Sequence, residues 1–346
     1  MPKLSFRIAL LVALASWGFA ERLTAQGPTF AFAEDSTYVE AVHVAGMGAF
    51  AKTIGAYETK LQHAATVMLR SRDPGLRAAA FDTIVTGLPV ALDLDGGRTY
   101  GFDRLQGVSH VADADEGRWR IFTWQHFVND STYRYGGVFV PTDRTKELHL
   151  LTDAAQGLGV ESDFELLPEQ WYGAVYFNTR AFRLSDGRPA WVLFGYDADG
   201  YYHRRKVADV LSFDRRGRPR FGAEVFVGSE RFPELTQSRI VLEYRTDARV
   251  RLNYDEQLGG IVHDRLVTGP APGPGLPPSQ VPDGSYDGYV LDEDAGVWRF
   301  REEYFDRVIS AEPPRPNPVF GRGEDDRDVF GRPRGSRRVR AKSPRH

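Results

Sequence analysis

The stretch WVLFGYDADGYYHRRKVADVLSF, residues 191–213, carries the clearest fold signal in the chain. Two runs rich in β-branched and aromatic side chains, 191–196 and 201–213, flank the turn-forming segment Asp197–Gly200. β-Branched and aromatic residues favour strands, and aspartate with glycine favours a tight turn. This segment therefore predicts two antiparallel strands joined by a short turn.

Similar runs recur from 99 to 308 at a spacing of about ten residues, with no long helical pattern between them. Short strands at this spacing favour an antiparallel meander over βαβ units, which need a crossover helix. We expect an α+β protein, predominantly antiparallel β, in which one large meander sheet or a partly open barrel fills residues 96–308.

The region before this β-domain, 26–95, has a helical pattern. Apolar residues recur at intervals of three and four, namely Tyr57, Leu61, Ala64, Ala65 and Met68. Asp73 followed by Pro74 is a typical helix start, because aspartate caps free N–H groups and proline fits the first helical position. Thr37 and Glu40 have the spacing of a capping box. We expect this segment to be helical.

Residues 1–25 predict a secretory signal peptide. Lys3 and Arg7 precede an apolar run, 8–15, and Leu23-Thr24-Ala25 offers a cleavage site. The run is shorter than the ~20 residues that span a bilayer, which disfavours a membrane anchor. The complete lack of cysteine suits an oxidising compartment. We expect an exported, soluble protein without a transmembrane segment, in the periplasm or outside the cell.

The net charge of −3 hides two regions of opposite sign. Residues 26–308 hold 31 basic and 41 acidic side chains, a net −10, whereas 309–346 hold ten and five, a net +5. The proline- and arginine-rich tail, 309–346, is predicted to be disordered, either as a solvated extension or in contact with an anionic envelope surface. The acidic body disfavours nucleic acid as a partner, although 201–206 combine aromatic and basic residues.

No sequence motif fixes a reaction. Without cysteine, thiolate metal sites and cysteine nucleophiles are excluded. The histidines have no H-x-H, H-x-x-x-H or H-E-x-x-H spacing, and the chain has no G-x-S-x-G elbow or phosphate-binding loop. We therefore predict no catalytic residue, no metal site and no cofactor.

The pattern D-x-D-x-G-x-W occurs twice, at 113–119 and 292–298. Clustered carboxylates suit calcium, but neither copy supplies the full ligand set of an EF-hand loop. A hairpin turn is the favoured interpretation, because aspartate accepts local N–H bonds and glycine takes a positive φ.

The acidic residues are compatible with a hydrolase as an alternative function. His263 and Asp264 would point to opposite faces of a strand, so we expect Asp264 to pair with an arginine across the sheet rather than with His263. A glycoside hydrolase needs two carboxyl groups facing one cleft, which spacing along the chain cannot reveal. The candidates are Asp197, Asp199, Asp255, Asp264 and Asp283.

Aromatic residues are dense in the strand region and suggest binding. Four of them are the candidate ligand-binding platform: Trp171, Tyr172, Tyr202 and Tyr286. Rings on a sheet surface stack on a sugar or an extended chain, whereas the same rings in a core only pack.

Eight segments within 105–305 together resemble a family of exported, uncharacterised proteins of Bacteroidota-type bacteria. They are WRIFTW (119–124), WYGAVYF (171–177), VLFGYD (192–197), RKVADVL (205–211), VLEY (241–244), LNYDE (252–256), IVHD (261–264) and PDGSYD (282–287). The resemblance implies export and a β-rich body and supplies no catalytic residue; the arginine-rich tail departs from it. We expect a non-catalytic envelope protein that binds or scaffolds an envelope component or glycan, with a secreted hydrolase using paired carboxylates as the alternative.

Overall fold

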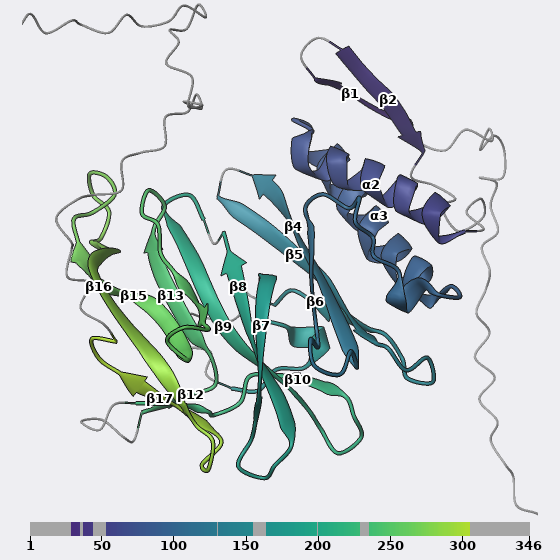
Figure 1. Cartoon of the computed structure of the whole chain (residues 1–346). Coiled ribbons are helices and arrows are strands. Elements are labelled where there is room, and N and C mark those ends of the chain that lie inside the picture. Colours follow the sequence, from purple (N-terminus) through teal and green to yellow (C-terminus); the bar gives the residue numbers. More distant parts are fainter. Residues whose placement is uncertain are drawn as a thin grey trace, which may run out of the picture. The chain divides into compact units, whose positions relative to one another are not determined.

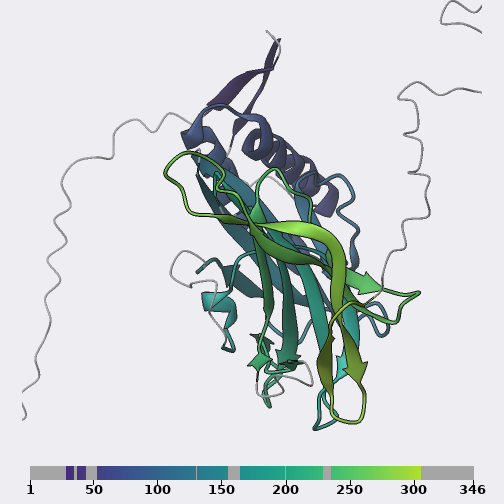
Figure 2. The same cartoon turned by 90° about the vertical axis from the view of Figure 1, so that its left-hand side faces the viewer.

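Three sheets lie one behind another, and two helices cover the outer face of the first sheet (Figures 1 and 2). The computed structural model describes residues 29–34, 37–43, 53–129, 131–154, 164–198, 200–228 and 235–304. All of them belong to one unit, residues 1–305. The predicted signal peptide, 1–25, and the predicted tail, 309–346, lie outside the described residues.

The described part of the chain begins with a strand pair, at the place where the capping-box pattern predicted a helix. β1 (Thr29–Glu34) pairs antiparallel with β2 (Thr37–His43). The helix prediction around Thr37 and Glu40 is therefore wrong. Three of the seven residues in TYVEAVH are β-branched and one is aromatic, so strand propensity outweighs a capping motif that has no long apolar stripe behind it.

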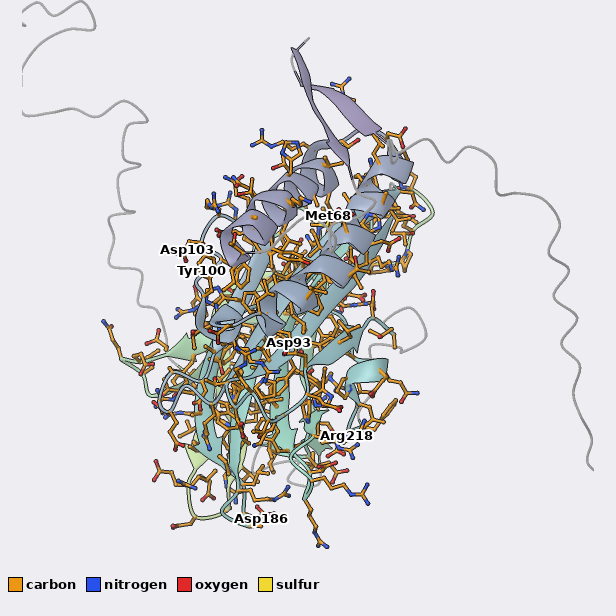
Figure 3. The ribbon with its side chains drawn as sticks, turned by 90° about the vertical axis from the view of Figure 1, so that its right-hand side faces the viewer. Met68, Asp93, Tyr100, Asp103, Asp186 and Arg218 are labelled. Carbon is orange, nitrogen blue, oxygen red and sulfur yellow. The ribbon has the colours of Figure 1, made fainter. Side chains whose placement is uncertain are left out.

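Both helices predicted further along are confirmed. α2 (Ile54–Arg70) begins after Thr53, whose hydroxyl accepts the Ala56 N–H. α3 (Pro74–Asp93) begins after Asp73, whose carboxylate accepts two N–H groups, with proline at the first position. Figure 3 shows the two helices lying across the strands, with Met68 on α2.

Within the described part of the chain, α3 is the one helix that could cross a membrane by its length and composition alone. Half of its apolar stretch is buried in the protein. Phe81, Ile84 and Leu88 pack in a core shared with α2 and the first sheet, so packing accounts for the hydrophobicity of this helix.

The first sheet is a meander that is buried on both faces. Its order is β3 (Val108–Ala112), β4 (Trp119–Asn129), β5 (Thr132–Pro141) and β6 (His149–Thr152). Phe122 and Val138 face the helices, whereas Ile121 and Phe139 face the second sheet. Alternation along each strand thus fills two cores at once.

The second sheet contains the hairpin predicted from residues 191–213. Its strands are β7 (Val175–Arg183), β8 (Pro189–Asp197), β9 (His203–Phe213), β10 (Pro219–Phe221) and β13 (Ile240–Arg245). β8 and β9 pair antiparallel from Trp191 opposite Leu211 to Asp197 opposite Arg205. β13 and β10 pair with successive parts of the other edge of β9.

The third sheet completes the stack. Its strands are β11 (Phe226–Val227), β12 (Thr236–Gln237), β14 (Leu252–Asp255), β15 (Gly260–Gly269), β16 (Ser279–Asp292) and β17 (Val297–Arg301). All pairs are antiparallel except β11 with β17. Short 3-10 helices occur at Gly97–Thr99 and Pro168–Gln170.

The predominantly antiparallel β architecture is therefore confirmed, but β3 to β17 form three stacked sheets rather than one large sheet, and β1 with β2 forms a separate two-stranded sheet. The sheets do not close into a barrel. The second core lies between the first and second sheets and contains Trp119, Trp171 and Trp191. The third lies between the second and third sheets and contains Phe194, Ile261 and Trp298.

Candidate functional site

The four predicted platform residues do not share one surface. Trp171 and Tyr172 are 0% and 1% exposed, in the core between the first and second sheets. The Trp171 indole N–H donates to the Tyr176 hydroxyl at 2.8 Å, so this ring is held inward and cannot stack on a ligand. That part of the prediction is wrong. Tyr202 is exposed, and Tyr286 is half-buried on β16.

Tyr202 instead belongs to a pocket lined by residues from the ends of all three sheets. We call it the three-sheet pocket; its volume is about 630 Å³, within the usual range of ligand sites. The first sheet contributes the β4–β5 hairpin, the second the β8–β9 turn and the end of β13, and the third the β15–β16 loop. The lining residues are Phe127, Tyr133, Gly200, Tyr201, Tyr202, Arg204, Arg245, Thr246, Asp247, Ala271 and Pro272.

Two adjacent tyrosines form the aromatic part of the pocket. The Tyr201 and Tyr202 rings lie edge to face, with centroids 4.8 Å apart, and are 62% and 40% exposed. Thr246 fixes their backbone, since its N–H donates to the Tyr202 carbonyl at 2.9 Å and its hydroxyl to the Tyr201 carbonyl at 3.0 Å. The two rings are therefore exposed to solvent, whereas hydrogen bonds fix the backbone of the turn that carries them.

Arg204 stabilises that turn from inside. Its Nη1 donates to the carbonyls of Ala198 and His203, both at 2.8 Å, and to that of Gly200. Its guanidinium carbon lies 5.9 Å from the centre of the Tyr133 ring on β5. Arg204 therefore fixes the β8–β9 turn and links it to the first sheet.

A buried network below the pocket anchors the same turn. The Tyr135 hydroxyl donates to Asp197 Oδ1 at 2.8 Å and accepts the Ala198 N–H at 2.6 Å. Arg205 lies 3.4 Å from Asp197 Oδ2 and 2.7 Å from Glu243 Oε2. Burial, with the nearby Asp197 charge, raises the pKa of Tyr135 well above its ordinary value, so the hydroxyl stays protonated and keeps donating.

An ion pair forms the polar part of the pocket. Arg245 Nε lies 2.6 Å from Asp247 Oδ1, and Arg245 Nη1 donates to the Pro270 carbonyl at 3.3 Å. The hydrogen bond from Arg245 lowers the pKa of Asp247 below its ordinary value, so this carboxylate is ionised at neutral pH. The pocket thus offers a donor and an acceptor beside two rings.

The acidic residues proposed for a hydrolase have local partners. Asp197 belongs to the network just described, and Asp199 lies outside the described residues. Asp255 accepts from Arg251 Nη2 at 2.7 Å and from two turn N–H groups, and Asp283 accepts from Ser285. Hydrogen bonds to neighbouring N–H groups and to a nearby arginine are typical of turns and ion pairs rather than of a catalytic acid pair.

Among the described residues, the Asp264 carboxylate does not form the predicted ion pair with an arginine side chain. Its Oδ2 accepts the main-chain N–H of Arg251 at 2.5 Å, so the arginine across the sheet contributes its backbone and not its guanidinium. His263 Nδ1 lies 3.0 Å from the Asp264 carbonyl oxygen, and its ring packs near Tyr289 and Phe300. The two side chains do not form a dyad.

Both D-x-D-x-G-x-W segments are hairpin turns, as predicted. The first joins β3 to β4, and Asp113 Oδ2 accepts from Arg118 Nε at 2.8 Å. The second joins β16 to β17, and Asp292 Oδ2 accepts from Arg299 Nε at 2.8 Å. In the described ranges, no group of three or more histidine, aspartate or glutamate side chains is placed to hold a metal ion.

Neither a protein family, nor a curated protein, nor a solved structure matches this chain. The sequence predicted Tyr202 as a binding residue, but it did not predict Arg245, Asp247 or the lining residues that come from the first and third sheets. The available signal was the Tyr201-Tyr202 pair directly after a turn glycine, because hydrophobic rings at a hairpin tip have no core to enter.

Proposed function

We propose that this protein is a non-catalytic, exported envelope protein that binds a glycan in the three-sheet pocket. The observation that carries the proposal is the exposed Tyr201–Tyr202 pair. The turn that bears the two rings is fixed by hydrogen bonds, and the Arg245–Asp247 ion pair beside it supplies a charged donor and a charged acceptor. A sugar ring has an apolar C–H face and a rim of hydroxyl groups. Aromatic rings suit the face, and fixed polar groups suit the rim.

Preorganisation supports binding at this place. The hydrogen bonds from Thr246 and Arg204 already hold the turn, so a ligand does not have to order it. Exposed aromatic rings that are held in place lose little conformational entropy on binding, and they remove apolar surface from water.

Export and envelope location support the same proposal from the sequence. The signal-peptide pattern of 1–25 predicts export to the compartment in which envelope glycans are found, and this supports the proposal. The basic tail, 309–346, would add electrostatic attraction to an anionic envelope surface, and in that role the protein scaffolds as well as binds.

Binding is tested with the full chain on an array of neutral, uronic-acid and amino-sugar oligosaccharides. Replacing both Tyr201 and Tyr202 with alanine is expected to weaken binding about tenfold or more, because stacking rings at an interface contribute on this scale. Phe177→Ala is the control, since Phe177 on β7 is 42% exposed but does not line the pocket.

Two outcomes would overturn the proposal. One is binding that the double tyrosine variant leaves unchanged, and the other is no binding to any class of sugar on the array. Release of new reducing ends from a bound oligosaccharide would instead support the hydrolase alternative, since cleavage of a glycosidic bond exposes one reducing end.

A further inference from the structure

We propose that Arg245 and Asp247 select a neutral sugar unit with two adjacent hydroxyl groups; this inference rests on the glycan-binding function proposed above. The pair stands at the end of β13, on either side of Thr246. Since Thr246 bonds to the carbonyls of both Tyr201 and Tyr202, the backbone places the ion pair directly beside the two rings.

The ion pair keeps hydrogen-bonding capacity for a ligand. Its known contacts use Asp247 Oδ1 together with Nε and Nη1 of Arg245. Within the described residues, Asp247 Oδ2 and Arg245 Nη2 make no hydrogen bond to another residue. The Asp247 side chain is 68% exposed and that of Arg245 is 23% exposed, so the carboxylate is the more accessible member.

The two groups have complementary chemistry. An ionised carboxylate only accepts hydrogen bonds, and a guanidinium only donates them. A hydroxyl group does both, so of two neighbouring hydroxyls on one sugar ring, one donates to Asp247 while the other accepts from Arg245. With the C–H face of the sugar on Tyr202, its hydroxyl rim is directed toward this pair.

The charges also act against ligands that carry a charge. A uronic acid would bring a second carboxylate close to Asp247, whose hydrogen bond from Arg245 keeps it ionised. An amino sugar would bring its ammonium group close to Arg245 and to Arg204 in the pocket wall. Because the two members of the pair lie 2.6 Å apart, a charged sugar meets a like charge beside each opposite one, and it gives up hydration that a neutral sugar does not lose, so both charged classes should bind less tightly.

The test measures affinities of the full chain by titration calorimetry with three kinds of probe. Mannohexaose and maltohexaose are neutral, oligogalacturonate is anionic, and a glucosamine oligomer is cationic. We expect the neutral probes to bind at least tenfold more tightly than either charged probe. Asp247→Asn and Arg245→Gln are each expected to weaken neutral binding about tenfold, the scale of a lost hydrogen bond to a charged group.

Asp186→Asn is the matched control. Arg188 Nε and Asp186 Oδ2 are also 2.6 Å apart and two residues apart in sequence, and Asp186 lies at the end of the sheets away from the helices (Figure 3). This variant is expected to bind like the wild type. Melting curves of all variants show whether each is folded.

The outcomes separate this inference from the function on which it rests. Tighter binding of a charged probe, or unchanged binding by Asp247→Asn and Arg245→Gln, overturns the selection of a neutral sugar while the glycan-binding function stands. If the double tyrosine variant also binds every probe like the wild type, the glycan-binding function itself is overturned.

Discussion

At the scale of single residues, the aspartates act mainly by holding the structure together. Asp209 on β9 is fully buried and accepts from Arg239 Nε at 3.3 Å, from the Tyr176 hydroxyl at 3.0 Å and from the Val210 N–H at 2.9 Å. Arg239 is also buried, with 1% of its side chain exposed. A charge in such a place is tolerated only because its partners replace water.

Arg239→Met is expected to lower the free energy of unfolding by about 3–5 kcal/mol, because it leaves the Asp209 charge buried without its counter-ion. Urea denaturation of the variant measures the loss. Adding Asp209→Asn keeps an acceptor for Tyr176 and removes the charge, so the double variant should recover part of the stability. A double variant less stable than Arg239→Met would contradict this explanation.

Residue type alone could not distinguish an exposed ring, which is free to contact a ligand, from a ring that packs in the core. Trp171 and Tyr202 are equally suited to stacking on a sugar. Trp171 lies after a short 3-10 helix and turns inward, where Tyr176 accepts its N–H. Tyr202 lies in the turn before β9 and belongs to none of the three cores. That difference depends on which sheet faces come together, and those contacts join residues far apart in the chain.

At the scale of elements, one side chain fastens the start of α3 to the first sheet. Arg77 is 6% exposed; its Nε donates to the Phe127 carbonyl at 2.7 Å and its Nη2 to the Val128 carbonyl at 3.2 Å. Its Nη1 donates to the Ser71 carbonyl at 2.9 Å, before the helix begins. Because Phe127 lines the three-sheet pocket, the same arginine connects the helix layer to a pocket wall.

Arg77→Leu is expected to destabilise the protein by about 3 kcal/mol, since three buried or partly buried carbonyl groups lose their donor. The exposed neighbour Arg72 provides the control, and Arg72→Ala should change stability by no more than about 0.5 kcal/mol. Urea denaturation measures both. Equal stabilities of the two variants would show that the Arg77 contacts contribute little.

Local sequence predicted the elements that depend on neighbours in the chain. The predicted cap Asp73 satisfies helix N–H groups two and three residues away, and the β8–β9 hairpin closes across one short turn. The parallel pairing of β11 with β17 has no such local signal, because its two strands are far apart in sequence. The capping-box pattern at Thr37 misled for a related reason: it marks where a helix can start but not whether a helix follows.

At the scale of the whole described unit, the stacking of sheets explains why the sequence did not distinguish separate sheets from one large sheet or a partly open barrel. Residues 190–195 on β8 are all buried, because the second sheet has a neighbouring sheet on each face. A strand buried on both sides gives a continuous apolar run. Such a run indicates a middle layer, but it does not show whether the outer sheets stack separately or curve round into a barrel.

The same layering predicts how stability depends on pH. Burial lowers the pKa of four histidines, His110, His126, His149 and His263. In the unfolded chain each takes up a proton near its ordinary pKa of about 6.5, whereas in the folded protein each stays neutral to lower pH. Above that pH both states are neutral, and below it only the unfolded state gains protons. The free energy of unfolding should therefore fall as the pH drops from 7 to 5.

His126→Phe isolates one of these contributions. The His126 ring packs 5.1 Å from that of Phe81, in a buried position that suits another ring. The variant no longer titrates at this position, so its unfolding free energy, measured by urea denaturation at each pH, should fall less steeply between pH 7 and pH 5 than that of the wild type. Parallel pH profiles would mean that His126 has the same pKa in both states, and a wild-type stability that rises on acidification would contradict the contribution of all four histidines.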